Sequence, residues 1–332
     1  MHSQSALDRF KAIHDALQRD RRWWRDSRRL RYAAVAAVTC EGDAGSVARG
    51  IRAVGKDLQD ECPWYWSVNP NVQFVVGALL LQHRDSAKRF IRELIRVRKL
   101  FRKQRLHRAL QYELLAVLIL RIGAEGRAVS ETTVRRFKAI YDEMKQHHRF
   151  LTGADDFPAC AILTGQSGAP RAVLSEIEAI YDQLHSQRFS KGNPLQTAAN
   201  IMYLARGSAR EVAGRAVALR DEFRVRKVRI GQRDYDELAI LSILELSAER
   251  VVTHVLHVRD ELEKVRPKID RALRFDLATG IAFADLIQPT RSTGSLGEAK
   301  MLMDVQTMIR AQQAVLMAAG AAAATAASAG GS

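Results

Sequence analysis

The residues of this sequence that are best suited to bind a ligand are arginines and lysines that stand beside aromatic side chains. Six arginines surround two tryptophans in residues 21–31, and residues 96–108 form a second basic run. Arginine neutralises phosphates and stacks with bases, and aromatic rings offer further stacking faces. The residues that we expect to contact an anionic partner are Arg21, Arg22, Trp23, Trp24, Arg25, Arg28, Arg29, Arg96, Arg98, Lys99, Arg102, Lys103 and Arg105.

A structural interpretation of these residues stays open beside the functional one. Terminal units of helical-repeat proteins need a cap, and the tryptophans could anchor it while the arginines form a solvated basic face. Trp64, Tyr65 and Trp66 add three more aromatic faces between the two basic runs. Both interpretations place the basic residues at the surface.

A metal site is the second candidate. His147 and His148 are followed across one turn by Asp155 and Asp156, and imidazoles close to carboxylates can bind a divalent cation that acts as a Lewis acid. The alternative is that an aspartate caps the helix beginning at Phe157, while the histidines complement the dipole of the preceding helix. His254 and His257 have helical spacing but no carboxylate partner at a diagnostic distance, which favours a surface pair. We expect no cofactor.

Catalytic signatures are missing from the sequence. It contains no GxSxG, Walker-type GxxxxGK[ST] or GxGxxG motif. This favours a binding protein over an enzyme, with a metal-dependent enzyme around residues 147–156 as the alternative. A third hypothesis is a protein–protein scaffold that forms homo-oligomers through a methionine-rich C-terminal helix.

Net charge points to the kind of partner. Residues 1–150 hold 30 Lys and Arg against 16 Asp and Glu, whereas residues 151–332 hold 22 against 21. Such a one-sided positive field favours an anionic macromolecule, either nucleic acid or an acidic protein. An arginine-rich but functionally neutral surface is the alternative.

The elements that must position these residues repeat along the chain. Six related segments begin at Ile51, Leu94, Phe137, Ile177, Ala216 and Val255, which are 43, 43, 40, 39 and 39 residues apart. Periods of this length are typical of helical repeats that bury their apolar faces against their neighbours. Asp142, Asp182, Asp221 and Asp260 recur at one position of the segments, where the first two carry Lys56 and Lys99. These aspartates could form an acidic ladder or pair with nearby arginines.

Each repeat has two parts. A short segment rich in alanine and large apolar residues predicts an inner helix, and a longer amphipathic segment predicts an outer one. Ser208 and Glu211 fit a capping box, and Ser86, Ser130 and Ser247 are expected N-caps at equivalent turns. We therefore predict an all-α fold, an α-solenoid or α/α toroid of about six helix pairs with an N-terminal capping helix and a C-terminal helix.

Four regions follow from this pattern. Residues 1–31 are the expected basic capping helix and residues 32–287 the repeat domain. Residues 288–317 form a loop and an amphipathic helix, and the uncharged residues 318–332 a disordered tail. Three cysteines without CxxC spacing, no signal peptide and no apolar run of membrane-spanning length indicate a soluble, cytoplasmic protein.

Two turn segments carry a resemblance to known sequences. His148-Arg-Phe-Leu-Thr-Gly-Ala-Asp-Asp-Phe-Pro158 and Lys191-Gly-Asn-Pro-Leu-Gln196 are similar to those of a bacterial family catalogued only as a domain of unknown function. The similarity covers most of residues 30–290. It implies a bacterial, cytosolic, all-helical protein and supplies no catalytic residues.

Overall fold

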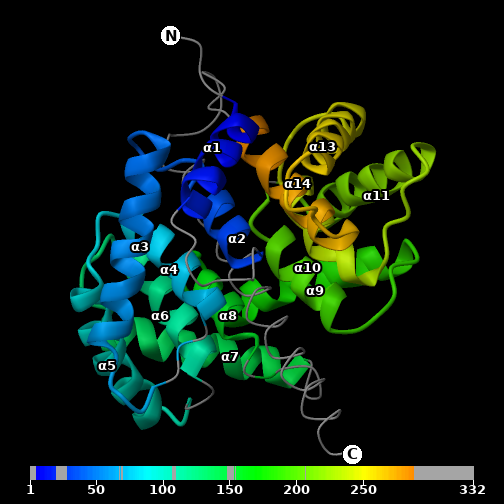
Figure 1. The fold of residues 1–332 in the computed structure, drawn as a ribbon. Coiled ribbons are helices and arrows are strands. Elements are labelled where there is room, and N and C mark those ends of the chain that lie inside the picture. Colours follow the sequence, from blue (N-terminus) through cyan, green and yellow to red (C-terminus); the bar gives the residue numbers. More distant parts are fainter. Residues whose placement is uncertain are drawn as a thin grey trace, which may run out of the picture.

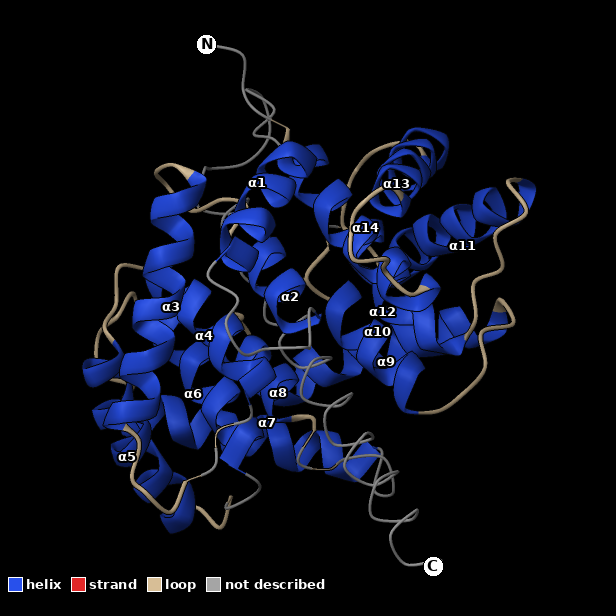
Figure 2. Ribbon diagram, viewed as in Figure 1, coloured by secondary structure: helices blue, strands red, loops and turns tan. Residues whose placement is uncertain are grey.

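The chain is all-helical in the part that the structure describes, as predicted (Figure 2). This computed structural model describes residues 5–19, 28–66, 68, 70–106, 110–147, 153, 155–205 and 207–287. The predicted C-terminal helix and tail lie outside these residues, as do residues 20–27 of the predicted cap. No strand occurs in the described ranges.

The helices alternate between shorter apolar and longer amphipathic ones over most of the chain. In order they are α1 (Ala6–Arg19), α2 (Arg28–Ala36), α3 (Ala44–Glu61), α4 (Pro70–Gln82), α5 (Ala87–Lys103), α6 (Leu110–Gly123), α7 (Glu131–His147), α8 (Phe157–Thr164), α9 (Pro170–Ser186), α10 (Asn193–Met202), α11 (Ala209–Val225), α12 (Tyr235–Ser242), α13 (Ala248–Glu263) and α14 (Arg271–Leu286). A 3₁₀ turn, η1 (Gln232–Asp234), precedes α12.

Two layers of helices result from this alternation. The even-numbered helices pack against one another in an inner layer, and each odd-numbered helix packs on the even-numbered helix that follows it (Figure 1). The inner helices are apolar nearly all round; every residue from Glu113 to Arg121 of α6 is buried. Small residues allow close packing, since a Cβ on Gly77 of α4 would lie 3.1 Å from the carbonyl oxygen of Ile51 in α3.

The two ends of the described array meet. Helix α14 packs against α1 and α2, and the backbone N–H of Ala6 donates to Asp285 at 2.6 Å. Lys11 of α1 lies 3.1 Å from Glu261 of α13, and Arg31 of α2 donates to the carbonyl of Pro267. Figure 1 shows α1 beside α14 after the chain has run through α5, α7 and α11. The described helices thus form the toroidal version of the predicted fold.

Helix α1 makes the contacts of a repeat unit and not only those of a cap. Its Arg9 donates to the carbonyl of Cys40, which follows α2. In the same way, Arg136 of α7 donates to the carbonyl of Thr164 at the end of α8, and Arg215 of α11 to that of Ser242 at the end of α12. Arg136 and Arg215 directly precede the first residue of their repeated segments, and Arg9 directly precedes the buried Phe10 of α1. The predicted boundary at residue 31 falls inside α2, which begins at Arg28 because the apolar run from Leu30 onward is buried in the inner layer.

Helix caps follow the sequence signals in most turns. The side chains of Ser86, Ser130, Ser208 and Ser247 accept N-cap hydrogen bonds, and Ser208 and Glu211 form the predicted capping box. Asp156 stands at the N-cap of α8 but accepts instead from the N–H of Gly153 at 2.7 Å.

Candidate anion-binding site on helix α5

Helix α5 carries the second basic run of the sequence. Ser86 caps its first turn, and Phe90, Leu94 and Phe101 form a buried stripe that packs it into the core. The helix ends in a left-handed residue, Arg105, with a φ of 57°, and the N–H of Leu106 then donates back to the carbonyl of Phe101 at 2.8 Å. With one face fixed in the core, the remaining faces of α5 have defined directions.

Arg98 points into the protein. It is 8% exposed and forms an ion pair with Glu113 of α6, which is fully buried. Its guanidinium also lies 4.6 Å from the ring centroid of Trp66, in the turn after α3, as a cation–π contact. Arg98 therefore joins α5 to α6 and holds the aromatic turn in place.

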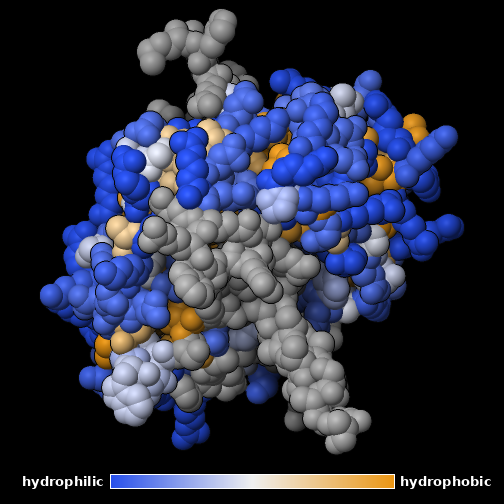
Figure 3. All heavy atoms as spheres, viewed as in Figure 1, coloured by the Kyte–Doolittle hydropathy of each residue, from blue (hydrophilic) through white to orange (hydrophobic). Residues whose placement is uncertain are grey.

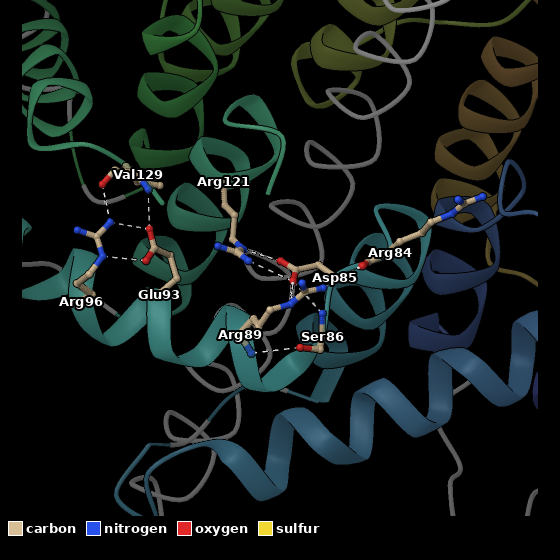
Figure 4. A network of polar contacts seen from close by, with 8 residues as sticks. All are labelled: Arg84, Asp85, Ser86, Arg89, Glu93, Arg96, Arg121 and Val129. Carbon is tan, nitrogen blue, oxygen red and sulfur yellow. Dashed lines mark hydrogen bonds and ion pairs between the residues drawn. The ribbon is translucent and has the colours of Figure 1, made fainter. Parts of the chain in front are cut away.

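Arg96 belongs to a polar network at the start of α5 (Figure 4). It donates to both carboxylate oxygens of Glu93, at 2.8 and 2.7 Å, and to the carbonyl of Val129. The backbone N–H of Val129 donates to Glu93 at 2.6 Å. Burial alone raises the pKa of Glu93, but the bonds and charge of Arg96 and the Val129 amide outweigh it and lower that pKa. Arg96 thus compensates the negative charge of the buried Glu93 carboxylate.

Asp85 forms the other half of this network. It accepts from Arg121 of α6, lies 3.1 Å from Arg89, and accepts from the N–H of Ser86 at 2.8 Å. Burial raises the pKa of Asp85, and the hydrogen bonds and charges of its partners lower it by more. The network couples the turn before α5 to the end of α6.

Four cations in the last turns of α5 and directly after it are exposed: Lys99, Arg102, Lys103 and Arg105. None of them forms an ion pair with a described residue within 4.0 Å. Arg102 follows Arg98 by four residues, one helical turn later, and Arg105 stands in the turn after the helix. Lys99 and Lys103 are also four residues apart and form the adjacent stripe.

Two exposed aromatic residues directly precede Trp66, whose ring lies against Arg98 of α5. Trp64 is 95% and Tyr65 68% exposed, whereas Trp66 is partly buried against the core. The rings meet edge to face, with centroids 5.7 Å apart for Trp64 and Tyr65 and 6.4 Å apart for Tyr65 and Trp66. Since Trp66 rests on Arg98, the turn that carries the exposed rings packs against the C-terminal half of α5. We call Trp64, Tyr65, Lys99, Arg102, Lys103 and Arg105 the basic–aromatic edge.

The remaining sequence candidates are not part of this edge. Residues 21–25 lie outside the described residues, and Arg28 and Arg29 form the first turn of α2. His147 ends α7, and His148 lies outside the described part. Within that part, no group of three or more His, Cys, Asp or Glu side chains could hold a metal ion, and Asp156 is engaged in the turn with Gly153. Asp155 raises the pKa of Tyr112, an effect second to that residue's burial.

Three of the four repeated aspartates pair with a nearby cation, and two of these cations are arginines, as the second interpretation predicted. Asp221 lies 3.4 Å from Arg220, and Asp260 lies 2.9 Å from Arg259. Asp142 pairs with Lys138 one turn earlier. These carboxylates are therefore charge-compensated, unlike the exposed cations of α5.

His254 has a role that its spacing did not predict. It is only 31% exposed, and its Nε2 lies 3.1 Å from Asp285, the carboxylate that also binds the N–H of Ala6. Thus it takes part in closing the ring. The contact joins residues 31 positions apart, and no local pattern reveals it.

The surface around these features is mainly polar. On the face drawn in Figure 3, the described residues are mostly hydrophilic, with hydrophobic ones in small separate groups. Among the described helices none is long and apolar enough to cross a membrane. An exposed tryptophan is therefore unusual on this molecule.

Comparison with known proteins gives a family and no activity. The model of a family described as "Protein of unknown function (DUF4003)" matches residues 6–314. The uncharacterized protein YeaA of Bacillus subtilis (strain 168) is 28% identical over 260 residues, which are 76% of this chain and 75% of that protein. No solved structure matches the chain.

Proposed function

The chain belongs to the DUF4003 family of proteins of unknown function, and on this premise we propose that it is a helical-repeat binding protein that recruits an anionic macromolecule. The contact surface is the basic–aromatic edge. The observation that carries the proposal is the exposure of Lys99, Arg102, Lys103 and Arg105 on one helix without a carboxylate partner.

These unpaired cations contrast with the residues at the equivalent position of three later outer helices. Outer helices α7, α11 and α13 place an aspartate at the position that Lys99 occupies in α5, and each aspartate is paired. An exposed cation without a partner keeps its attraction for anions from outside, because no internal carboxylate neutralises it. The excess of Lys and Arg in residues 1–150 adds a long-range field of the same sign.

The packing of α5 fixes the backbone that carries these cations. The buried stripe of α5, the Arg98–Glu113 ion pair and the network around Asp85 fix the helix against α6. The cations therefore project from a fixed backbone, and a phosphate chain need not order that backbone when it binds. Each phosphate that a cation neutralises releases a counterion, so binding should weaken steeply as salt rises.

The test uses polyanions of two kinds, a fluorescent oligothymidylate and polyglutamate. We expect the full chain to bind at low salt and the affinity to fall linearly on a log–log plot against salt. The charge-reversed variant Lys99→Glu/Arg102→Glu/Lys103→Glu should lose most of this binding while keeping its helical circular dichroism. Binding that is absent from the unmodified chain, or indifferent to salt, would remove the proposal.

The matched control reverses charges on α11. The triple variant Arg224→Glu/Lys227→Glu/Arg229→Glu changes the same net charge at another outer helix and its following turn. It should keep most of the binding, because these residues lie outside the edge. An equal loss in both variants would mean that net charge alone attracts the polyanion, which contradicts a defined site.

A further inference from the structure

The exposed tryptophan of the edge points to a more specific ligand. We propose that Trp64 is a stacking platform for a base of single-stranded nucleic acid, whose phosphates lie along the cations of α5. This inference rests on the proposed function and specifies the class of anionic macromolecule that the chain binds.

Trp64 does nothing for the described fold. It is 95% exposed, while Trp66, two residues later in the same turn, packs against the core and covers Arg98. A large aromatic side chain is usually mostly buried in a folded protein, and the informative exceptions mark contact surfaces. Trp64 and its neighbour Tyr65 thus offer ring surface that a partner from outside the chain can contact.

The turn holds this ring in a definite position. The N–H of Trp66 donates to the carbonyl of Pro63 at 2.8 Å, which closes the turn around Trp64 and Tyr65. The ring planes of Trp64 and Tyr65 meet at 88°, and the Trp64 side chain is still 95% exposed. Below them, Trp66 sits on the guanidinium of Arg98, which Glu113 fixes from α6. The stacking face is thus built before a ligand arrives.

The combination of ring and cations selects the chemical class. A flat π face in the turn that packs on α5, together with the exposed positive charges of that helix, matches the alternation of base and phosphate in a nucleic acid strand. Bases within a duplex already stack on each other, so only an unpaired strand offers a face to Trp64. An acidic protein supplies the charge but no regular flat rings. The edge therefore fits single-stranded nucleic acid best.

The experiment separates the stacking from the charge. Wild type, Trp64→Ala and Trp64→Phe are titrated with oligothymidylate and with heparin, a polyanion without bases. We expect Trp64→Ala to weaken oligothymidylate binding about 5- to 150-fold, the range for loss of one stacked base, with Trp64→Phe between the two. Heparin binding should not change. The exposed position makes misfolding of these variants easy to exclude by thermal melting.

Val225 provides the matched control, because it is an apolar side chain that is 70% exposed at the end of α11. Val225→Ala should bind both polyanions like wild type. Heparin binding without any effect of Trp64→Ala on oligothymidylate would overturn the stacking and leave the anion-binding function standing. Anionic lipid vesicles that shift the Trp64 fluorescence, with no response to oligothymidylate, would also overturn it in favour of a membrane surface. Absence of binding to every polyanion would refute the proposed function itself.

Discussion

Replacing Arg105 by glycine separates the charge of the edge from the stability of the fold. Arg105 follows the last turn of α5 with a φ of 57°, in the left-handed region. An L-residue pays about 1–2 kcal/mol for this conformation. Glycine adopts it freely but loses about 0.5–1 kcal/mol more in conformational entropy on folding. The two effects leave Arg105→Gly more stable by up to about 1.5 kcal/mol, which urea denaturation measures as a higher midpoint with an unchanged slope.

The same substitution should weaken polyanion binding. Arg105 is exposed and unpaired, so its guanidinium contributes to ligand binding and little to the fold. Loss of one phosphate contact lowers the slope of log affinity against log salt by about 0.7 for a single strand. Fluorescence anisotropy of a labelled oligothymidylate at several potassium chloride concentrations gives this slope. Stability and affinity should therefore move in opposite directions.

Lys227→Gly is the control for this prediction. Lys227 is exposed after α11 with a φ of 60°, and the N–H of Val228 donates to the carbonyl of Phe223 at 2.8 Å, as Leu106 does to Phe101. This variant removes the same charge from the same backbone geometry and should be equally stabilised, with an unchanged salt slope. An equal loss of binding in both variants, or a lower stability of Arg105→Gly than of wild type, would contradict this prediction.

Three further predictions concern the scaffold that holds the edge. Arg98→Ala leaves Glu113 buried without its charge partner and should destabilise the chain by about 3–5 kcal/mol, measured by urea denaturation, whereas an unchanged midpoint would contradict the ion pair. Asp85 and Glu93 have lowered pKa values, so their stabilisation is present above the usual carboxylate range and is lost as pH falls below about 4. Asp85→Asn should flatten this acid dependence of the urea midpoint, and an identical pH profile would count against it. Asp285→Ala removes the acceptor shared by Ala6 and His254 and should speed amide exchange in α1 more than in α7; equal rates would show that the contact does not close the ring.

Periodicity and capping residues were sufficient to predict the helices. The buried stripe of α5 and the cap at Ser86 are local, and both appear in a window of one helix. Ring closure could not be predicted in this way. It depends on Asp285 meeting Ala6 across 279 positions, and neither residue carries a signal of that contact.

The candidate site was predictable as a segment but not residue by residue. Arg98 and Arg102 stand one turn apart in the same basic run, yet one is buried and the other exposed. The difference comes from Glu113 and Trp66, which lie 15 and 32 positions from Arg98 and meet it only in the folded chain. For the same reason the sequence shows three adjacent aromatic residues without indicating that Trp66 packs while Trp64 stays exposed.

Amide hydrogen exchange of the full chain, with and without oligothymidylate, tests the central claim most directly. The ligand should slow exchange in residues 62–66 and in the C-terminal half of α5, because these backbones carry the basic–aromatic edge. Helices α11 and α13 should exchange at the same rate in both samples. Protection confined to those helices, or no protection in residues 62–66 and 99–105 at saturating ligand, would contradict the account.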